Sequence, residues 1–137
     1  MADHRITWFV QDRVIQVRYD SEVTLDHLEE HAVRMCQMVD SVDSPLIHLL
    51  IDVAELDKYP KQVTKIGPTL KQLYNHPRVG WSVIYNQDDR IIGFLASAIT
   101  SMFKVRFRSF KTEQEAFEFL NSVDETLPDL RTFIGKS

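Results

Sequence analysis

The chain has 137 residues, of which 44% are hydrophobic and 26% are charged, and its formal net charge is −4. This length predicts one domain with a proper hydrophobic core, and the composition is that of a globular protein. The acidic balance argues against a nucleic-acid backbone as the main partner, and the single cysteine, Cys36, excludes an internal disulfide and fits a reducing cytoplasm.

The N-terminal half predicts a hairpin, a helix and a central strand. Apolar residues alternate over 6–10 and again over 14–19, which is typical of two strands with one solvated face, joined by a short turn. Thr24 is a good N-cap, and apolar residues three and four positions apart predict a helix that follows it. The nearly continuous apolar run at 46–51 indicates a central parallel strand that is covered on both faces.

The C-terminal half alternates helices and strands. Helical spacing over 63–73 is interrupted by Gly67-Pro68, which predicts either a kinked helix or two short helical pieces. A strand at 79–85, a helix at 90–103 and a strand at 105–110 follow. Thr112-Glu-Gln-Glu115 is a capping box that opens a last core helix, and Pro128 is a candidate start of a short terminal helix. The order ββαβαβαβα predicts an α/β fold with a mixed, mostly parallel five-stranded sheet and an N-terminal antiparallel hairpin.

Two stretches carry a resemblance to a known family. They are HPRVGWSVIY at 76–85 and FKVRFRSFKTEQEAFEFL at 103–120, with its arginine-bearing strand and its capped Glu-Ala-x-x-Phe-Leu helix. Together they resemble the SpoIIAA-like family, which is related to the STAS domains (sulphate transporter and anti-sigma-factor antagonist). The resemblance covers about residues 5–122 of a single domain over 1–137, with 123–137 as a C-terminal extension. It implies a non-catalytic cytoplasmic module that binds a partner protein, an apolar or lipid-like ligand, or a membrane surface.

The sequence departs from the STAS antagonists at one position of interest. Those proteins carry a phosphorylatable serine after the third strand, at the start of the next helix. Here residues 55–63 read ELDKYPKQV, and the first hydroxyl side chain after them belongs to Thr64. We therefore expect no phosphorylation switch in this segment.

Asp52 is the most suggestively placed acid, because it follows the central apolar run. A phosphoacceptor aspartate needs further acids near it to hold a divalent cation, and the end of the first strand offers only Asp12, in a hairpin. We expect Asp52 to accept hydrogen bonds from loop amides instead. His48, on the same strand face, is expected to be a neutral, hydrogen-bonded core histidine, with a polar anchor at the floor of a pocket as the alternative.

His27-Leu-Glu-Glu-His31 matches the H-x-x-E-H pattern of one class of zinc proteases. His27 lies about 120° from the centre of the apolar stripe of its helix, which predicts a solvated face without the dry cleft that metal chemistry needs. No third ligand is evident, so we expect no metal and no cofactor. Cys36 falls on the core stripe and is expected to be a small apolar filler rather than a nucleophile. The alternative function is a small hydrolase or metalloenzyme that uses Asp52 and His48 or the His27/His31 pair.

The segment IIGFLASAITSMF at 91–103 predicts a helix whose apolar residues cover about 200° of its surface, more than a helix on a sheet needs. Large apolar side chains left in water would each forfeit about 1.5–3 kcal/mol. The surplus could be covered by a neighbouring helix or the 128–134 tail, by a second copy of the chain in a homodimer, or by an apolar ligand. Such a ligand would lie against the 63–73 segment, whose Gly67-Pro68 break we interpret as a hinge.

The leading hypothesis is a non-enzymatic binding or regulatory module whose partner is a protein, a second copy of the chain or a lipid-like molecule. The apolar contacts would come from Tyr59, Val63, Ile66, Leu95, Ile99 and Phe103. The N-terminus lacks the apolar segment of a signal peptide, and the uncharged run at 91–103 would span only about 20 Å as a helix. We therefore expect a cytoplasmic protein without a transmembrane segment, for which peripheral membrane contact stays open.

Overall fold

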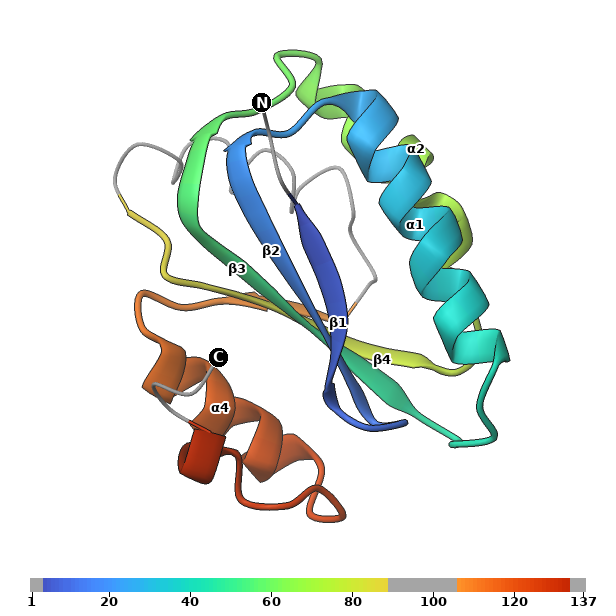
Figure 1. Cartoon of the computed structure of the whole chain (residues 1–137), viewed down its shortest axis with the longest axis vertical. Helices are drawn as coiled ribbons and strands as arrows, with labels where there is room; N and C mark the ends of the chain where they lie inside the picture. Colours follow the sequence, from blue (N-terminus) through green and yellow to red (C-terminus); the bar gives the residue numbers. More distant parts are fainter. Residues whose placement is uncertain (1–3, 89–105, 134–137) are drawn as a thin grey trace.

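The computed structural model describes residues 4–88 and 106–133, and its centre is a five-stranded sheet. The strands are β1 (Arg5–Val10), β2 (Val14–Glu22), β3 (Ile47–Lys58), β4 (Val79–Tyr85) and β5 (Phe107–Ser109). They lie side by side in the order of the sequence, with β1 and β2 antiparallel and every later neighbouring pair parallel (Figure 1). This arrangement confirms the predicted mixed sheet with its N-terminal hairpin.

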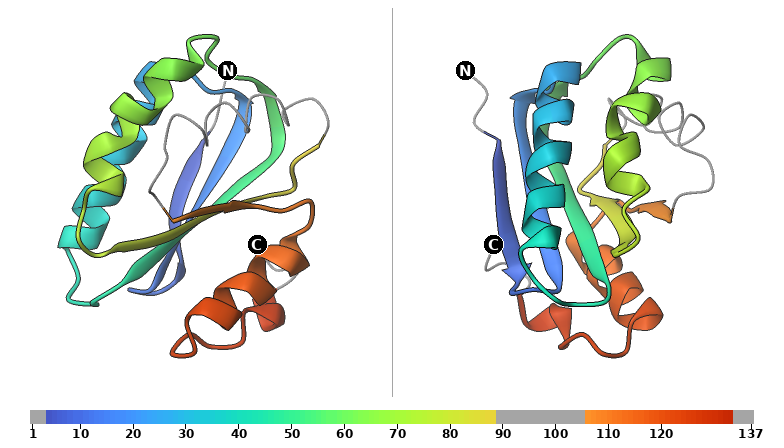
Figure 2. Two further views of the ribbon diagram at one scale, coloured as in Figure 1. Left: turned by 180° about the vertical axis from the view of Figure 1, so that it is seen from behind. Right: turned by 90° about the vertical axis from the view of Figure 1, so that its right-hand side faces the viewer.

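Helices cover the sheet on both faces. On one face lie α1 (Leu25–Asp40), the short 3-10 helix η1 (Val63–Lys65) and α2 (Ile66–Tyr74). On the other face lie α4 (Glu113–Val123) and the 3-10 helix η2 (Leu130–Phe133), as the two views of Figure 2 show. The predicted helix at 90–103 lies outside the described residues. No helix in the described part of the chain is long and apolar enough to cross a membrane.

The central strand β3 is buried on both faces, as its apolar run predicts. Ile47, Leu49 and Ile51 point into the core under α1 and α2, whereas Leu50 points into the core under α4. The strand continues to Lys58, beyond the predicted end at residue 51, because β2 pairs with it as far as Glu22.

The start of α2 corrects one alternative for the Gly67-Pro68 dipeptide. The helix does not kink there, since α2 begins at Ile66 and both residues lie in its first turn. The first backbone N–H groups of a helix have no intrahelical acceptor, so Pro68 removes no hydrogen bond from α2. The two helical pieces of the other alternative are η1 and α2, and they join before Gly67, not at it.

The C-terminal stretch completes the core under α4. Leu127 and Leu130 are buried there together with Ala116, Phe117 and Leu120 of α4. The side chain of Asn121 holds the stretch in place, because its amide donates to the Pro128 carbonyl at 2.8 Å and accepts from the Leu130 N–H at 2.9 Å. The predicted terminal helix is the short η2.

Candidate functional site

A groove of about 370 Å³ lies where β2 and β3 end and the chain passes into α1 and η1. Its lining, which we call the rim groove, consists of Glu22, Val23, Thr24, Leu25, Asp26, Tyr59, Pro60, Lys61 and Gln62. Ligands of open α/β sheets commonly bind outside the carboxyl ends of the strands, and this groove occupies that position for the parallel pair β2 and β3.

Local hydrogen bonds fix the walls of the rim groove. Thr24 is the N-cap of α1, as predicted, and its hydroxyl accepts from the His27 N–H at 3.1 Å. The His27 ring returns a bond, because its Nδ1 accepts from the Thr24 N–H at 3.1 Å and completes a capping box. The Val23 N–H donates to the Lys58 carbonyl at 3.0 Å and ties the two strand ends together.

The structure places the predicted ligand contacts in different surroundings. Tyr59 is half-buried, lines the rim groove and packs against the core. Ile66 is only 2% exposed and lies inside the core under α1 and α2. Val63 opens η1, and Leu95, Ile99 and Phe103 lie outside the described residues.

Asp52 serves as a structural acceptor, which confirms the prediction for this residue. Its Oδ1 accepts from the Ala54 N–H at 3.0 Å and from the Asn86 amide at 3.1 Å. Its Oδ2 lies 3.6 Å from the Arg18 Nε. Asp52 therefore fastens the ends of β2, β3 and β4 to one another.

His48 is fully buried and hydrogen-bonded at both ring nitrogens, as predicted for a core histidine. Its Nδ1 accepts from the Trp81 N–H at 3.0 Å, so the neutral ring carries its proton on Nε2. That Nε2–H donates to the Asp124 carboxylate at 2.9 Å. Burial lowers the pKa of His48 despite the neighbouring carboxylate, and with Nδ1 occupied the ring has no nitrogen left to act as a base.

Asp124, the partner that sequence reasoning missed, is the C-cap residue of α4. Its carboxylate also lies 3.3 Å from the Arg13 guanidinium. Burial opposes its ionisation, but hydrogen bonds from Thr126 and His48 outweigh that effect and lower the pKa of Asp124 to about 2. Gly80 is required beside this pair, since a Cβ there would stand 2.5 Å from the Nδ1 of His48.

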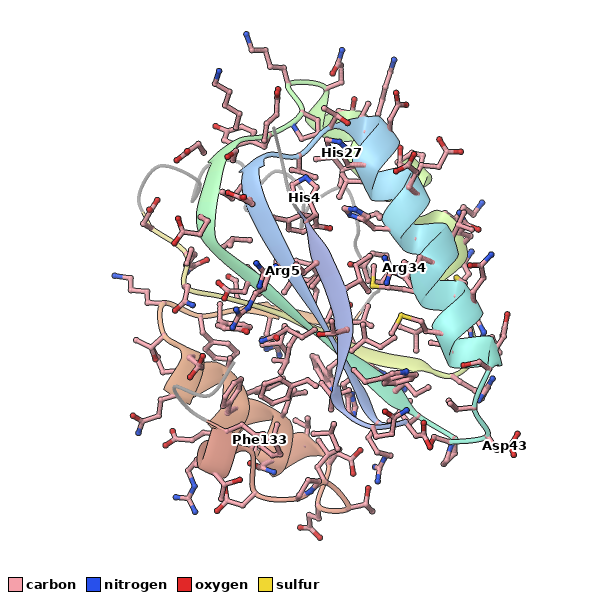
Figure 3. The ribbon with its side chains drawn as sticks, in the orientation of Figure 1. His4, Arg5, His27, Arg34, Asp43 and Phe133 are labelled. Atoms are coloured by element: carbon pink, nitrogen blue, oxygen red, sulfur yellow. The ribbon has the colours of Figure 1, made fainter. Side chains whose placement is uncertain are left out.

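The structure corrects the prediction that His27 and His31 face solvent. Both are half-buried, because the N-terminal end of β1 brings His4 against them (Figure 3). The ring centroid of His4 lies 4.8 Å from that of His27 and 5.3 Å from that of His31. Burial, with the neighbouring His4, His27 and Arg34, lowers the pKa of His31 to about 4.

These imidazoles do not form a metal centre. Within residues 4–88 and 106–133, no three His, Cys, Asp or Glu side chains are placed to hold one ion. The Nδ1 of His4 accepts from the Asp20 N–H at 3.0 Å, and the Nδ1 of His27 serves the cap of α1. Cys36 packs against the core, as predicted, and burial raises the pKa of its thiol.

Comparison with known proteins identifies the fold but no close relative. No protein-family model matches the chain, and no curated protein matches it. A structure of the Bacillus cell fate determinant SpoIIAA in its phosphorylated form superposes with a TM-score of 0.54, at 11% identity over 86% of this chain and 99% of the other. The anti-sigma factor antagonist SpoIIAA in its unphosphorylated form gives 0.59, at 10% identity over 92% of this chain and 100% of the other. A Shewanella loihica PV-4 protein of the DUF3478 family with a SpoIIAA-like fold gives 0.58, at 18% identity over 87% and 93%.

Proposed function

The chain has a SpoIIAA-like fold, and on that premise we propose that it is a non-enzymatic regulatory module which binds a partner protein through the rim groove. The observation that carries this proposal is that the two most reactive-looking side chains, Asp52 and His48, make hydrogen bonds that stabilise the fold. Asp52 accepts hydrogen bonds from Ala54 and Asn86, and both nitrogens of His48 are hydrogen-bonded. We infer that this part of the molecule acts as a binding surface, because the side chains of Asp52 and His48 both make structural hydrogen bonds.

The lining of the rim groove suits a protein partner. Its lining combines the half-buried Tyr59 and Leu25 with three exposed charged residues, Glu22, Asp26 and Lys61. An aromatic and aliphatic centre with a polar border is the usual anatomy of a non-obligate interface. A similar fold occurs in an anti-sigma factor antagonist, whose name describes action on another protein.

The regulation of this module would differ from a phosphorylation switch in the segment after β3. Residues 55–63 contain no serine or threonine, so binding at the rim groove would not be controlled by a phosphoserine or a phosphothreonine in that segment. We place the protein in the cytoplasm, in keeping with its single half-buried cysteine.

The test compares a charged substitution inside the rim groove with a control substitution on the exposed side of α1. The wild-type chain, Tyr59→Lys and Val33→Lys would each be used to enrich proteins from an extract of the source organism. The protein retained by the wild type would then be purified and titrated by calorimetry. Tyr59→Lys should weaken binding at least about tenfold, while Val33→Lys, on the exposed side of α1, should stay within about twofold.

A second groove variant guards against a folding defect. Gln62 is exposed, so Gln62→Lys should fold normally and still weaken binding. A retained protein that binds all variants equally would refute the rim groove as its site. Native mass spectrometry that finds only a bound lipid or a homodimer, with no groove-dependent protein partner, would refute the proposal and favour one of the other occupants.

A further inference from the structure

A second cavity, on the α4 face of the sheet, lies apart from the rim groove and measures about 330 Å³. We call it the arginine pocket. It lies between the β1–β2 hairpin and the C-terminal η2, and two residues of its lining, Arg5 and Phe133, are labelled in Figure 3. Its cationic end is formed by Arg5 and Arg18, its middle by Thr7 and Gln16, and its apolar end by Phe9 and Phe133.

Among the described residues, the cationic end carries one positive charge without an ion-pair partner. Arg5 and Arg18 stand directly opposite each other in the antiparallel register, an arrangement that is unfavourable for like charges. Asp52 balances only Arg18, at 3.6 Å, and no residue in the described part of the chain forms an ion pair with Arg5. The buried Nε of Arg18 has no hydrogen-bond partner there either.

The rest of the pocket is preorganised. Gln16 is only 6% exposed, and its amide donates to the Tyr85 hydroxyl at 2.6 Å, which fixes the polar middle. The Phe9 ring lies 5.0 Å from the Phe133 ring and 5.2 Å from the Phe117 ring, which fixes the apolar wall. A ligand would therefore meet a formed site and lose little free energy to ordering it.

From this geometry we infer that the arginine pocket binds a small monocarboxylate with an apolar body, its carboxylate on Arg5 and Arg18 and its body on Phe9 and Phe133. A guanidinium presents a planar fork that matches a carboxylate. One uncompensated positive charge favours a monoanion over a dianion such as a phosphate monoester. The volume is at the lower end for ligand pockets, which suits one aromatic ring or a short acyl chain.

The inference can be tested with phenylacetate as the probe. The full chain, labelled with ¹⁵N, would be titrated at pH 7 and low salt with phenylacetate, with the neutral phenylacetamide and with phenyl phosphate. Phenylacetate should shift the amides of β1 and β2 around Thr7 and Gln16 and saturate. Phenylacetamide and phenyl phosphate should each bind at least about tenfold more weakly.

A matched pair of variants separates the pocket from the net charge. Arg5→Gln and Arg34→Gln remove the same charge, but Arg34 lies on α1, on the opposite side of β1 (Figure 3). Arg5→Gln should weaken phenylacetate binding at least about tenfold, and Arg34→Gln should leave it within about twofold. Arg5 is exposed, so its replacement should leave the fold intact.

Several results would overturn the inference. They are the absence of any shift at about 10 mM phenylacetate, equal affinity for the amide, tighter binding of phenyl phosphate, or equal loss in the two arginine variants. Each of these results is independent of the rim groove, because the two sites have no lining residue in common. Failure of this inference therefore differs from failure of the proposed function.

Discussion

The two faces of the sheet differ in the kinds of side chain that they carry. The face under α1 and α2 is packed mainly with aliphatic side chains, with Tyr19 and Phe107 among them, and Leu49 is fully buried there. The face under α4 is aliphatic and aromatic only where α4 and η2 cover it. Beyond that cover, Arg5, Arg18 and Asp52 form a register row of polar residues across β1, β2 and β3, and the row continues on β4 to Tyr85, which is buried under α4.

We assign the stability of the fold mainly to the aliphatic face, and the recognition of a ligand to the face under α4. Burial of aliphatic surface contributes most of the free energy of folding, and this contribution does not depend on the direction of individual contacts. Polar groups near the interior must each find a partner, so they fix geometry at some cost in stability. The α4 face carries such groups, and it holds the arginine pocket and the His48–Asp124 pair.

The largest effect is expected from Leu49→Ala, on the face under α1 and α2. Leu49 is fully buried in the central strand, so the truncation leaves a cavity and should lower the free energy of unfolding by about 2–5 kcal/mol. Urea unfolding checks this value. Val33→Ala, at a side chain that is 40% exposed on α1, is the control and should change stability by less than about 0.5 kcal/mol. Equal losses in the two variants would contradict the description of this face as the stabilising one.

A smaller effect is expected from Gly80→Ala, on the α4 face. The added methyl group would meet the His48 ring at 2.5 Å from Nδ1, and the resulting overpacking should cost about 1–3 kcal/mol. In a His48→Ala background the same substitution should cost much less, because the clashing ring is gone. A double-mutant cycle without coupling between the two positions would show that this contact does not constrain Gly80.

A third effect is a pH dependence of stability at the edge of the α1 face. The pKa of His31 is about 4 in the fold, below its ordinary value of 6.5, so the unfolded chain takes up this proton first as the pH falls. The free energy of unfolding should therefore decrease between pH 6.5 and about 4. Urea titrations at several pH values should show a weaker decrease in His31→Phe, which keeps a ring against His4 and Tyr19 but cannot titrate. An unchanged decrease in that variant would contradict the assignment to His31.

Local patterns in the sequence predicted most of the fold. The alternation in the hairpin, the Thr24 and Thr112 caps and the apolar run of β3 depend on neighbouring residues, and all four are found. The Gly67-Pro68 pair predicts a break in the helix, whereas both residues lie in the first turn of α2, because sequence spacing alone does not say whether a proline lies inside a helix or in its first turn.

The contacts that define the sites could not be predicted in the same way. Asp124 lies 76 positions from His48, and no periodicity links a helix C-cap to a ring on a distant strand. The position of His4 beside His27 and His31 depends on how β1 crosses α1, a tertiary feature. The Arg5–Arg18 pair was within reach of sequence reasoning, because the hairpin register follows from its turn.

The most direct test of the account is the protonation state of His48, measured by long-range ¹H–¹⁵N NMR. Both nitrogens of this ring make structural hydrogen bonds, so the ring is not available as a base. We expect the neutral Nε2–H form at pH 7, with a titration midpoint below the ordinary histidine value of 6.5. A proton on Nδ1, or a midpoint at or above 6.5, would show a ring free to exchange protons and would contradict the account.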